Sequence, residues 1–482
     1  MDNKKQVYAI WGTGEDGKAC HKMISMIDCD VCCFFDSNEL LWGTSLFDRP
    51  ILCPDNIVNL SRNTILVIGS SSYHFEIRKR IDELLEFRSH LTIVSYEELC
   101  DKVVDFSLRN KRLDSRIKYE YTTLDRDVLY DDQIFSAQSY GGITRYFEEI
   151  INGISKGWQV DIFKGVNNSF ASISKDVRIL FDVQTNNPRL SLRGVRCAYN
   201  RRLLRDNQNA IGKYKIYHPT YYDDYNLNCY EHLVVTVHDM IHEIFGMDPS
   251  IIQKKKQLVH KADAIIAVSE NTKRDVIDFL GVDSKKIRVI YHGNSLLRCN
   301  NLENPYRFPY ILFVGNRSGY KNFETLIKAF SKTSYVKDIH IVCFGGGCFT
   351  NDELTLIRDL KLDGKIEQIS GSDDLLASMY QGAEIFVYPS LYEGFGLPLL
   401  EAMHFATPII TSCISSMPEI GGSAALYFDP YSIEDLSDKL EMMLTDNELR
   451  NKYSMLGKER ESNFSWGKCI AETKELYDSL LR

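Results

Sequence analysis

The stretch that most constrains this chain is residues 388–403, YPSLYEGFGLPLLEAM. Its first residues complete a short apolar run, IFVYPS, that predicts a buried parallel strand, and LPLLEAM has the apolar spacing of a helix start. Between them lies a turn that contains Gly394 and Gly396. A strand, a glycine turn and a helix in succession are how α/β proteins present bare backbone N–H groups to an anion.

Two carboxylates flank this turn. Glu393 stands directly before the glycines, and Glu401 follows inside the predicted helix, about two helical turns further on. The two side chains therefore reach different parts of one ligand. Phosphate at the amides, with carboxylates for hydroxyl groups, suggests that the ligand is a sugar nucleotide.

The size and charge of the chain narrow the classes of protein to consider. Its 482 residues are enough for two to four domains, and its net charge of -9 argues against bulk affinity for nucleic acid. No apolar run approaches the length of a membrane span, and the first residues lack the layout of a signal peptide. The 13 scattered cysteines fit reduced thiols. We therefore expect a cytoplasmic enzyme.

Residues 1–105 predict a small Rossmann-like α/β domain. Gly12, Gly14 and Gly17 follow a strand in GxGxxG spacing, and Asp36 ends the next strand, near the position that binds ribose hydroxyls in dinucleotide folds. The motif fits a nucleotide site, and it fits equally a doubly wound domain that keeps its tight turn without a ligand. The stretch resembles the small Rossmann-like domains attached to bacterial sugar-modifying enzymes, a resemblance that names no ligand.

A polar linker over residues 106–120 leads to a second α/β domain, predicted over 121–300. Residues 128–135 predict a strand, and Gly141 and Gly142 open a helix whose amides could face an anion. Three later strands end in His218, His238 and His292, at the sheet edge where open α/β sheets keep their sites.

A local excess of basic residues interrupts this domain. Residues 193–215 contain seven arginines and lysines against one acid, Asp206. A solvated helix face is the default interpretation. The sharper one is a patch for anionic lipid headgroups or a lipid-diphosphate acceptor.

The third α/β domain is predicted over 301–465. Its first strand leads into a glycine-containing loop with Arg317 and Lys321, cations that suit a diphosphate at a helix N-terminus. The last segment, 466–482, predicts an amphipathic helix that packs back on the middle domain.

In combination, these motifs resemble glycosyltransferase family 4, over about three quarters of the chain. EGFGLPLLEAM matches the family's E-x7-E motif, VGNRSGYKN its diphosphate loop, GGITRYF its first glycine loop, and VVTVHDM and AIIAVSE its middle-domain strands. The resemblance implies the GT-B fold, in which two Rossmann-like domains face a cleft. Here a small additional Rossmann-like α/β domain precedes them.

The resemblance also assigns roles to individual residues. Glu393 and His238 would line the reaction centre, with Glu393 on the transferred sugar, and Glu401 would bind the ribose. In many relatives the loop arginine directly follows the VG pair, whereas here Asn316 does. His218 and Ser269 are weaker candidates. The predicted donor-binding residues are Gly141, Gly142, Arg317, Lys321, Gly394, Phe395, Gly396 and Glu401.

The implied chemistry is retaining sugar transfer that needs no cofactor and no metal. Two Asp-x-Asp pairs, Asp28/Asp30 and Asp125/Asp127, lie outside the matched motifs. The donor would be a nucleotide-diphosphate sugar. The VGNRSGYKN loop resembles that of mannosyl-type members, which favours mannose on a guanosine nucleotide. The acceptor would be a glycan or lipid-linked oligosaccharide of a surface polysaccharide such as lipopolysaccharide, with the enzyme peripheral at the inner membrane face.

Two alternatives concern the first domain. In one, it is a dinucleotide-dependent enzyme that modifies sugar nucleotides, although it lacks a Tyr-x3-Lys pair. In the other, it is a regulatory module that senses a nucleotide or docks a partner.

Overall fold

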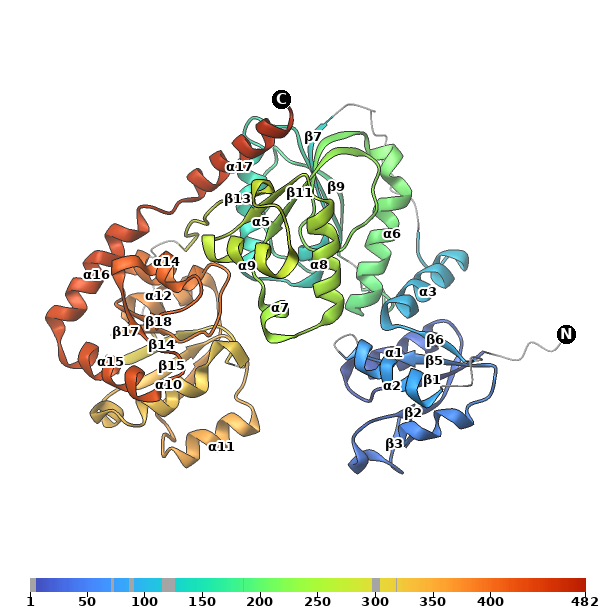
Figure 1. Cartoon of the computed structure of the whole chain (residues 1–482), viewed down its shortest axis with the longest axis horizontal. Coiled ribbons are helices and arrows are strands. Elements are labelled where there is room, and N and C mark those ends of the chain that lie inside the picture. The colour runs from blue at the N-terminus through green and yellow to red at the C-terminus, as the bar shows by residue number, and fades with distance from the viewer. Residues whose placement is uncertain are drawn as a thin grey trace. The chain divides into compact units, whose positions relative to one another are not determined.

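The structure is a computed structural model that describes residues 6–70, 73–85, 91–114, 126–184, 186–296, 304–317 and 319–482. It forms two compact units. The first comprises Met1–Val235 and His242–Asp263, and the second comprises Thr236–Ile241 and Ala264–Arg482. Each unit is built from parallel strands and helices (Figure 1), so the predicted α/β class is confirmed. Residues 115–125, which include Asp125 and most of the predicted linker, and the predicted limit at 300/301 lie outside the described residues.

The first sheet has the strand order β3-β4-β2-β1-β5-β6. All its pairs are parallel except β3 with β4. The chain winds from β1 to β2 on one side and later adds β5 on the other, so the winding reverses at β1. The elements are β1 (Val7–Trp11), α1 (Glu15–Met26), β2 (Asp30–Phe35), β3 (Ser45–Leu46), β4 (Arg49–Leu52), β5 (Thr64–Ile68), α2 (His74–Leu84), β6 (Thr92–Val94) and α3 (Tyr96–Arg109).

A second parallel sheet in this unit has the order β11-β10-β7-β8-β9. Its strands and helices follow one another as β7 (Arg126–Tyr130), α4 (Gln133–Ala137), α5 (Gly142–Ile154), β8 (Val160–Val166), β9 (Arg178–Val183), α6 (Arg193–Ile211), β10 (Tyr214–His218), β11 (Tyr230–Val237), α7 (Ile241–Phe245) and α8 (Pro249–Lys261).

The predicted strand over residues 128–135 is wrong in its second half. Strand β7 ends at Tyr130, and the short helix α4 begins at Gln133. The cause is a pair of fully buried carboxylates, Asp131 and Asp132, that leave the strand to reach hydrogen-bond donors. Tyr217 donates to Asp131, and Asn200 donates to Asp132 at 2.6 Å. Because these donors come from distant parts of the chain, the apolar pattern does not reveal the break.

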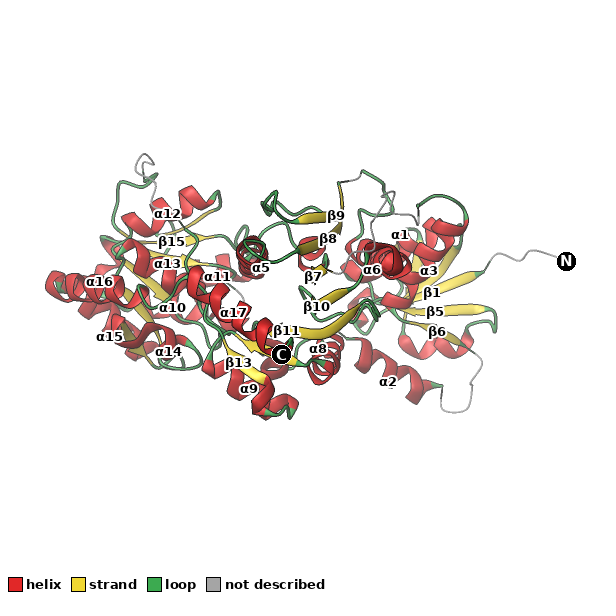
Figure 2. Cartoon of the chain, turned by 90° about the horizontal axis from the view of Figure 1, so that it is seen from above, coloured by secondary structure: helices red, strands yellow, loops and turns green. Residues whose placement is uncertain are grey.

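Helix α3 connects the two sheets of the first unit. It begins at Ser95, whose side chain and that of Glu98 form a capping box, and it continues past the predicted domain limit at residue 105. Helices α3 and α6 lie side by side in both views (Figures 1 and 2). A Cβ atom on Gly194 of α6 would stand 2.7 Å from the Tyr96 ring and the Cys100 sulfur of α3. This close approach requires glycine at position 194.

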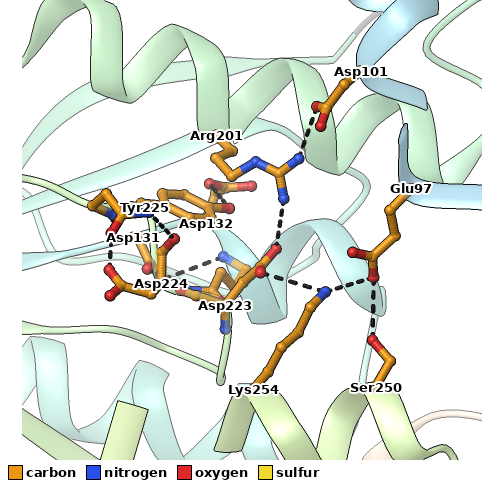
Figure 3. A network of polar contacts seen from close by, with 12 residues as sticks. Glu97, Asp101, Asp131, Asp132, Arg201, Asp223, Asp224, Tyr225, Ser250 and Lys254 are labelled. Carbon is orange, nitrogen blue, oxygen red and sulfur yellow. Dashed lines mark hydrogen bonds and ion pairs between the residues drawn. The ribbon is translucent and has the colours of Figure 1, made fainter. Parts of the chain in front are cut away.

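Most of the basic run 193–215 forms helix α6, and Arg201 of this helix has acidic partners inside the protein (Figure 3). Arg201 bonds Asp101 of α3 at 2.8 Å and Asp223 at 3.1 Å. Arg202 pairs with Asp105 of α3, and Lys254 of α8 pairs with Glu97 of α3 at 2.6 Å. Two of the seven cations of the run, Arg201 and Arg202, are therefore matched by acids of α3. Contact with a membrane stays a prediction.

The second unit contains the parallel pair β12 (Ala264–Ala267) and β13 (Ile287–Val289) and a six-stranded parallel sheet in the order β16-β15-β14-β17-β18-β19. The sheet strands are β14 (Tyr310–Val314), β15 (His340–Phe344), β16 (Ile366–Ile369), β17 (Ile385–Tyr388), β18 (Ile409–Ser412) and β19 (Ala425–Phe428). The helices are α9 (Glu270–Leu280), α10 (Phe323–Phe330), α11 (Asn351–Asp359), α12 (Asp373–Gly382), α13 (Leu397–Phe405), α14 (Met417–Gly421), α15 (Ile433–Thr445), α16 (Asn447–Glu461) and α17 (Trp466–Leu480).

Helix α17 contacts residues that the predicted limits place in the middle domain. The Trp466 indole donates to the Ser295 hydroxyl at 2.7 Å, and Arg288 of β13 pairs with Glu475 at 2.7 Å. The end of the chain thus packs on β13 and the segment after it.

We expect Arg201→Met to destabilise the first unit by about 1–3 kcal/mol, because it leaves the half-buried Asp223 without this cationic partner. Arg205→Met is the matched control, since Arg205 lies one turn along α6 with a more exposed side chain. It should change stability by less than about 0.5 kcal/mol. Urea denaturation followed by circular dichroism checks both values. Equal effects would show that the α3–α6 ion pairs contribute nothing specific.

Candidate functional site

The glycine turn between β17 and α13 is held by a close approach of two backbone segments. Gly396, at the start of α13, has a left-handed backbone with φ 99°. A Cβ atom on Gly394 would stand 1.7 Å from the backbone oxygen of His238, the residue that follows β11. No side chain fits there, so glycine at position 394 lets the turn lie directly against His238.

Hydroxyl groups fix the carbonyls of the turn. Ser269 and Thr272, at the start of α9, donate to the Gly394 oxygen at 2.6 and 3.0 Å. Ser415 and Ser416 donate to the Glu393 oxygen at 2.7 and 3.0 Å. With the carbonyls bonded on the protein side, the turn is rigid before any ligand binds. Ser269, a weaker candidate from the sequence, anchors the turn through its bond to the Gly394 oxygen.

Lys321 and Glu393 form an ion pair beside this turn. The Nζ atom of Lys321 lies 2.7 Å from a carboxylate oxygen of Glu393 and 3.3 Å from the Tyr388 hydroxyl. The two charged side chains are 15% and 11% exposed, so the pair is shielded from bulk water yet still accessible. The structure thus brings together two of the predicted site residues from different loops.

Glu401 occupies the second turn of α13 and is buried. The Tyr380 hydroxyl of α12 donates to its carboxylate at 2.8 Å. A carboxylate has further lone pairs, so this bond orients Glu401 and leaves capacity to accept from a ligand hydroxyl. The sequence did not indicate that Tyr380 orients Glu401, because α12 precedes the E-x7-E motif in the chain.

Arg317 has internal partners. Its guanidinium bonds Glu353 of α11 at 2.8 Å and donates to the backbone oxygens of Gly347 and Cys348 at 2.9 and 3.0 Å. Burial opposes ionisation of Glu353, but hydrogen bonds from Arg317 and Thr350 outweigh it and lower the pKa of this carboxyl. Arg317 therefore shapes the glycine-rich loop after β15, and its predicted contact with a diphosphate stays a prediction.

Two histidines lie close to the glycine turn. The His238 and His292 rings are 6.3 Å apart, and the His292 ring packs 4.7 Å from the Phe395 ring and 5.6 Å from the Trp466 ring. Burial lowers the pKa of His292 to about 3, so its ring is neutral at physiological pH. The neutral His292 ring therefore packs between the Phe395 and Trp466 rings as an apolar contact.

In the first unit, Gly141 precedes α5 and Gly142 is the first residue of that helix. A Cβ atom on Gly141 would meet the Gln138 amide at 2.5 Å, so this loop is tightly closed. His218 packs 5.4 Å from the Phe147 ring of α5, and burial lowers its pKa to about 3. Because these residues belong to a different compact unit from Lys321, their contact with the donor stays a prediction.

The first unit also contains a buried carboxylate pair, Asp131 and Asp132 (Figure 3). Burial raises the pKa of both Asp131 and Asp132, and the neighbouring charge of Asp131 contributes to a value of about 7 for Asp132. The Gln133 amide donates to Asp131 at 2.7 Å and to the Asp223 backbone at 2.8 Å. Hydrogen bonds thus connect this pair to the Arg201 and Lys254 ion pairs.

The predicted residues of the first domain also come together. Gly12, Gly14 and Asp36 line a pocket of about 570 Å³ at the carboxyl ends of β1, β2 and β5. Gly17 lies under it in α1, where a Cβ atom would stand 2.1 Å from the Gly12 oxygen.

Comparison with known proteins assigns the class. A model described as Glycosyl transferases group 1 matches residues 300–460, and one described as Glycosyltransferase Family 4 matches residues 140–296. A third model, C2185-like, N-terminal, matches residues 3–89.

Curated relatives agree with these matches. The O-antigen chain mannosyltransferase B of Escherichia coli is 28% identical over 56% of this chain and 76% of its own length. The O-antigen chain mannosyltransferase RfbU of Salmonella typhimurium is 33% identical over 41% of this chain and 56% of its own. The Serotype-specific mannosyltransferase WbdA of Escherichia coli is 28% identical over 46% of this chain and only 29% of its own.

Solved structures show the same fold. The sucrose-phosphate synthase of Thermosynechococcus elongatus superposes with a TM-score of 0.60 at 18% identity, over 74% of this chain and 99% of that one. WaaG, a glycosyltransferase involved in lipopolysaccharide biosynthesis, superposes with a TM-score of 0.57 at 14% identity, over 73% and 99%. The chain is thus a glycosyltransferase with the GT-B fold. It carries both family domains, as predicted, behind a C2185-like N-terminal domain.

Within the described residues, no helix is both long and apolar enough to cross a membrane.

We expect Gly394→Ala to destabilise the second unit by about 1–3 kcal/mol or to displace the turn, because the added methyl group meets the His238 backbone. Gly467→Ala is the control, since the nearest atom to a Cβ there is a side-chain oxygen at 3.9 Å. Thermal unfolding measures both. A Gly394→Ala protein as stable and active as the native chain would contradict this account of the turn.

The depressed pKa of His292 predicts acid sensitivity. In the unfolded chain its pKa is near 6.5, so the unfolded state binds an additional proton as the pH falls from 6.5 toward 3. The stability that neutral His292 contributes is fully present above pH 6.5 and is lost over this window. His292→Phe should therefore lose less stability between pH 7 and 5 than the native protein. His260→Gln, which changes an exposed histidine, controls for the loss of a histidine as such.

Proposed function

We propose that this glycosyltransferase is a retaining, metal-independent hexosyltransferase. It moves a sugar from a nucleotide-diphosphate sugar to a hydroxyl group of a glycan or lipid-linked oligosaccharide. The sugar is mannose from guanosine diphosphate mannose, and the product is a surface polysaccharide of the lipopolysaccharide type. The mannosyltransferase names of the curated relatives support the choice of sugar and pathway class.

The Lys321–Glu393 pair at the rigid glycine turn is the observation that supports this proposal most. An ammonium group has three donor positions, so Lys321 can keep Glu393 and also donate to a diphosphate. The backbone N–H groups of Gly394, Phe395 and Gly396 adjoin the same turn. Together they supply positive potential where charge develops on the leaving diphosphate, without a metal ion.

The carboxylates position the rest of the donor. Glu401 is held by Tyr380 and accepts from the ribose hydroxyls, while Glu393 contacts the transferred sugar. Since Lys321 balances the charge of Glu393, this carboxylate acts as a hydrogen-bond acceptor for sugar hydroxyls. His238 lines the reaction centre beside Gly394.

Retention follows from attack on the leaving-group face. The bond between the anomeric carbon and the diphosphate oxygen breaks while the acceptor oxygen bonds to that carbon. The acceptor proton passes to a phosphate oxygen of the departing diphosphate. No protein nucleophile is needed, and the enzyme's task is to stabilise the diphosphate and to exclude water, which would otherwise hydrolyse the donor. The reaction takes place on the cytoplasmic side, with the enzyme peripheral at the inner membrane face.

The test is transfer from labelled sugar nucleotides to lipid-linked acceptors by the purified full chain. We expect guanosine diphosphate mannose to be the best donor, an anomeric configuration that is retained by NMR, and full activity in EDTA. Lys321→Ala should lower kcat by about 100-fold or more, since it removes the cation from the leaving group. Glu401→Ala should raise the KM for the donor.

Two further variants distinguish loss of donor binding from loss of folding stability. Arg317→Ala should lose thermal stability as well as activity, because Arg317 holds the loop after β15 together. Lys332→Ala removes an exposed ion pair with Glu434 and should change neither thermal stability nor activity. Full activity in both Lys321→Ala and Glu401→Ala would overturn the assignment of this site, and an inverted product would overturn the mechanism.

A further inference from the structure

The pocket of the first domain lies where ligands bind in doubly wound sheets. Strand β1 has β2 on one side and β5 on the other, so the winding reverses at this point. The pocket of about 570 Å³ lies at the carboxyl ends of these strands. It is lined by Gly12 and Gly69, the first residues after β1 and β5. Neither the ion-pair network nor the proposed transfer reaction makes use of it.

Two of the three motif glycines are explained by packing. A Cβ atom on Gly12 would stand 2.7 Å from the Gly69 oxygen, and φ at Gly12 is 118°. A Cβ atom on Gly17 would stand 2.1 Å from the Gly12 oxygen. These glycines let strand, turn and helix pack closely, which is a structural requirement and says nothing of a ligand.

Gly14 is different. Its φ of -68° is open to any residue, and an added Cβ would have nothing within 4 Å. Neither backbone strain nor packing therefore requires glycine here. Gly14 precedes α1, a helix of 12 residues whose N-terminus has no side-chain cap, and it lines the pocket. The missing side chain leaves the first amides of α1 open to whatever fills the pocket.

Asp36 provides the second contact point. Thr13 donates its backbone N–H to one carboxylate oxygen at 3.1 Å, and the Asn38 N–H donates to the other at 2.9 Å. The Thr13 hydroxyl also donates to the first of these oxygens, so the carboxylate is fixed at the edge of the pocket. The other oxygen, which accepts from Asn38, keeps a lone pair for a hydroxyl donor. Glu15, Asp16 and Glu76 also line the pocket, and no lysine or arginine does among the described residues.

We propose that this pocket binds a nucleotide with an unmodified ribose diol, placing the diol on Asp36 and its phosphate on the amides beside Gly14. The acidic lining disfavours a ligand with additional phosphate groups on the sugar. The site goes beyond the proposed transfer reaction, because its residues belong to the first sheet and its loops, whereas Lys321, Glu393 and Glu401 belong to the second unit.

The test uses the full chain with Lys321→Ala, so that the donor site is weakened. Isothermal titration with the diphosphates of adenosine, uridine and guanosine, with guanosine diphosphate mannose and with NAD would identify the ligand. We expect at least one of these to bind. Gly14→Leu, whose Cβ would have no atom within 4 Å and whose side chain would occupy the pocket, is then added. It should weaken that binding by at least 10-fold while the melting temperature stays the same. Lys18→Met, on an exposed part of α1, is the matched control.

The ribose contact is tested separately. The 2′-deoxy form of the bound nucleotide should bind at least several-fold more weakly, and a 2′-phosphorylated form, such as NADP in place of NAD, should not bind. If no nucleotide of the panel binds the Lys321→Ala chain, or if Gly14→Leu leaves binding unchanged, the proposal is overturned. Both outcomes are independent of sugar transfer, which is measured on the chain with native Lys321.

Discussion

The glycine turn of the second unit depends on one contact between two backbone segments, that of Gly394 with the carbonyl of His238. The contact places the turn before α13 against the end of β11, and four hydroxyl groups then bond its carbonyls. Glu393 and the amides of residues 394–396 belong to this turn, Glu401 follows it in α13, and Lys321 reaches Glu393 from a separate loop. In the proposed reaction, amides that these hydrogen bonds already hold in place would need little reorganisation as charge develops on the leaving group.

Much of this site follows from local sequence. The strand, glycine turn and helix around Glu393 are set by residues that are close in the chain, so a pattern of apolar and glycine positions indicates them well. The GT-B fold was predictable for the same reason, since several such units recur with matching motifs. The glycine triplet after β1 was equally clear, although only the structure separates Gly14 from the two glycines that packing requires.

The errors and open points come from partners that are distant in sequence. Residues 128–135 have the composition of a strand, but Asp131 and Asp132 are buried among hydrogen-bond donors that include the distant Tyr217 and Asn200. Arg317 has the position of a ligand-binding cation, and only the fold shows that Glu353 and the loop after β15 surround it. The charge run in α6 has the pattern of an exposed patch, since its acidic partners lie about a hundred residues earlier.

Those acidic partners have a practical consequence for anyone who shortens the chain. Helix α3 belongs by sequence to the first domain, yet its Glu97, Asp101 and Asp105 neutralise Lys254, Arg201 and Arg202 of the next one. A protein that begins after α3 would lose three acids from this network, and Arg201, Arg202 and Lys254 would share only Asp206 and Asp223. Such a fragment should bind polyanions such as heparin more strongly than the intact chain does, because it has lost these acidic partners.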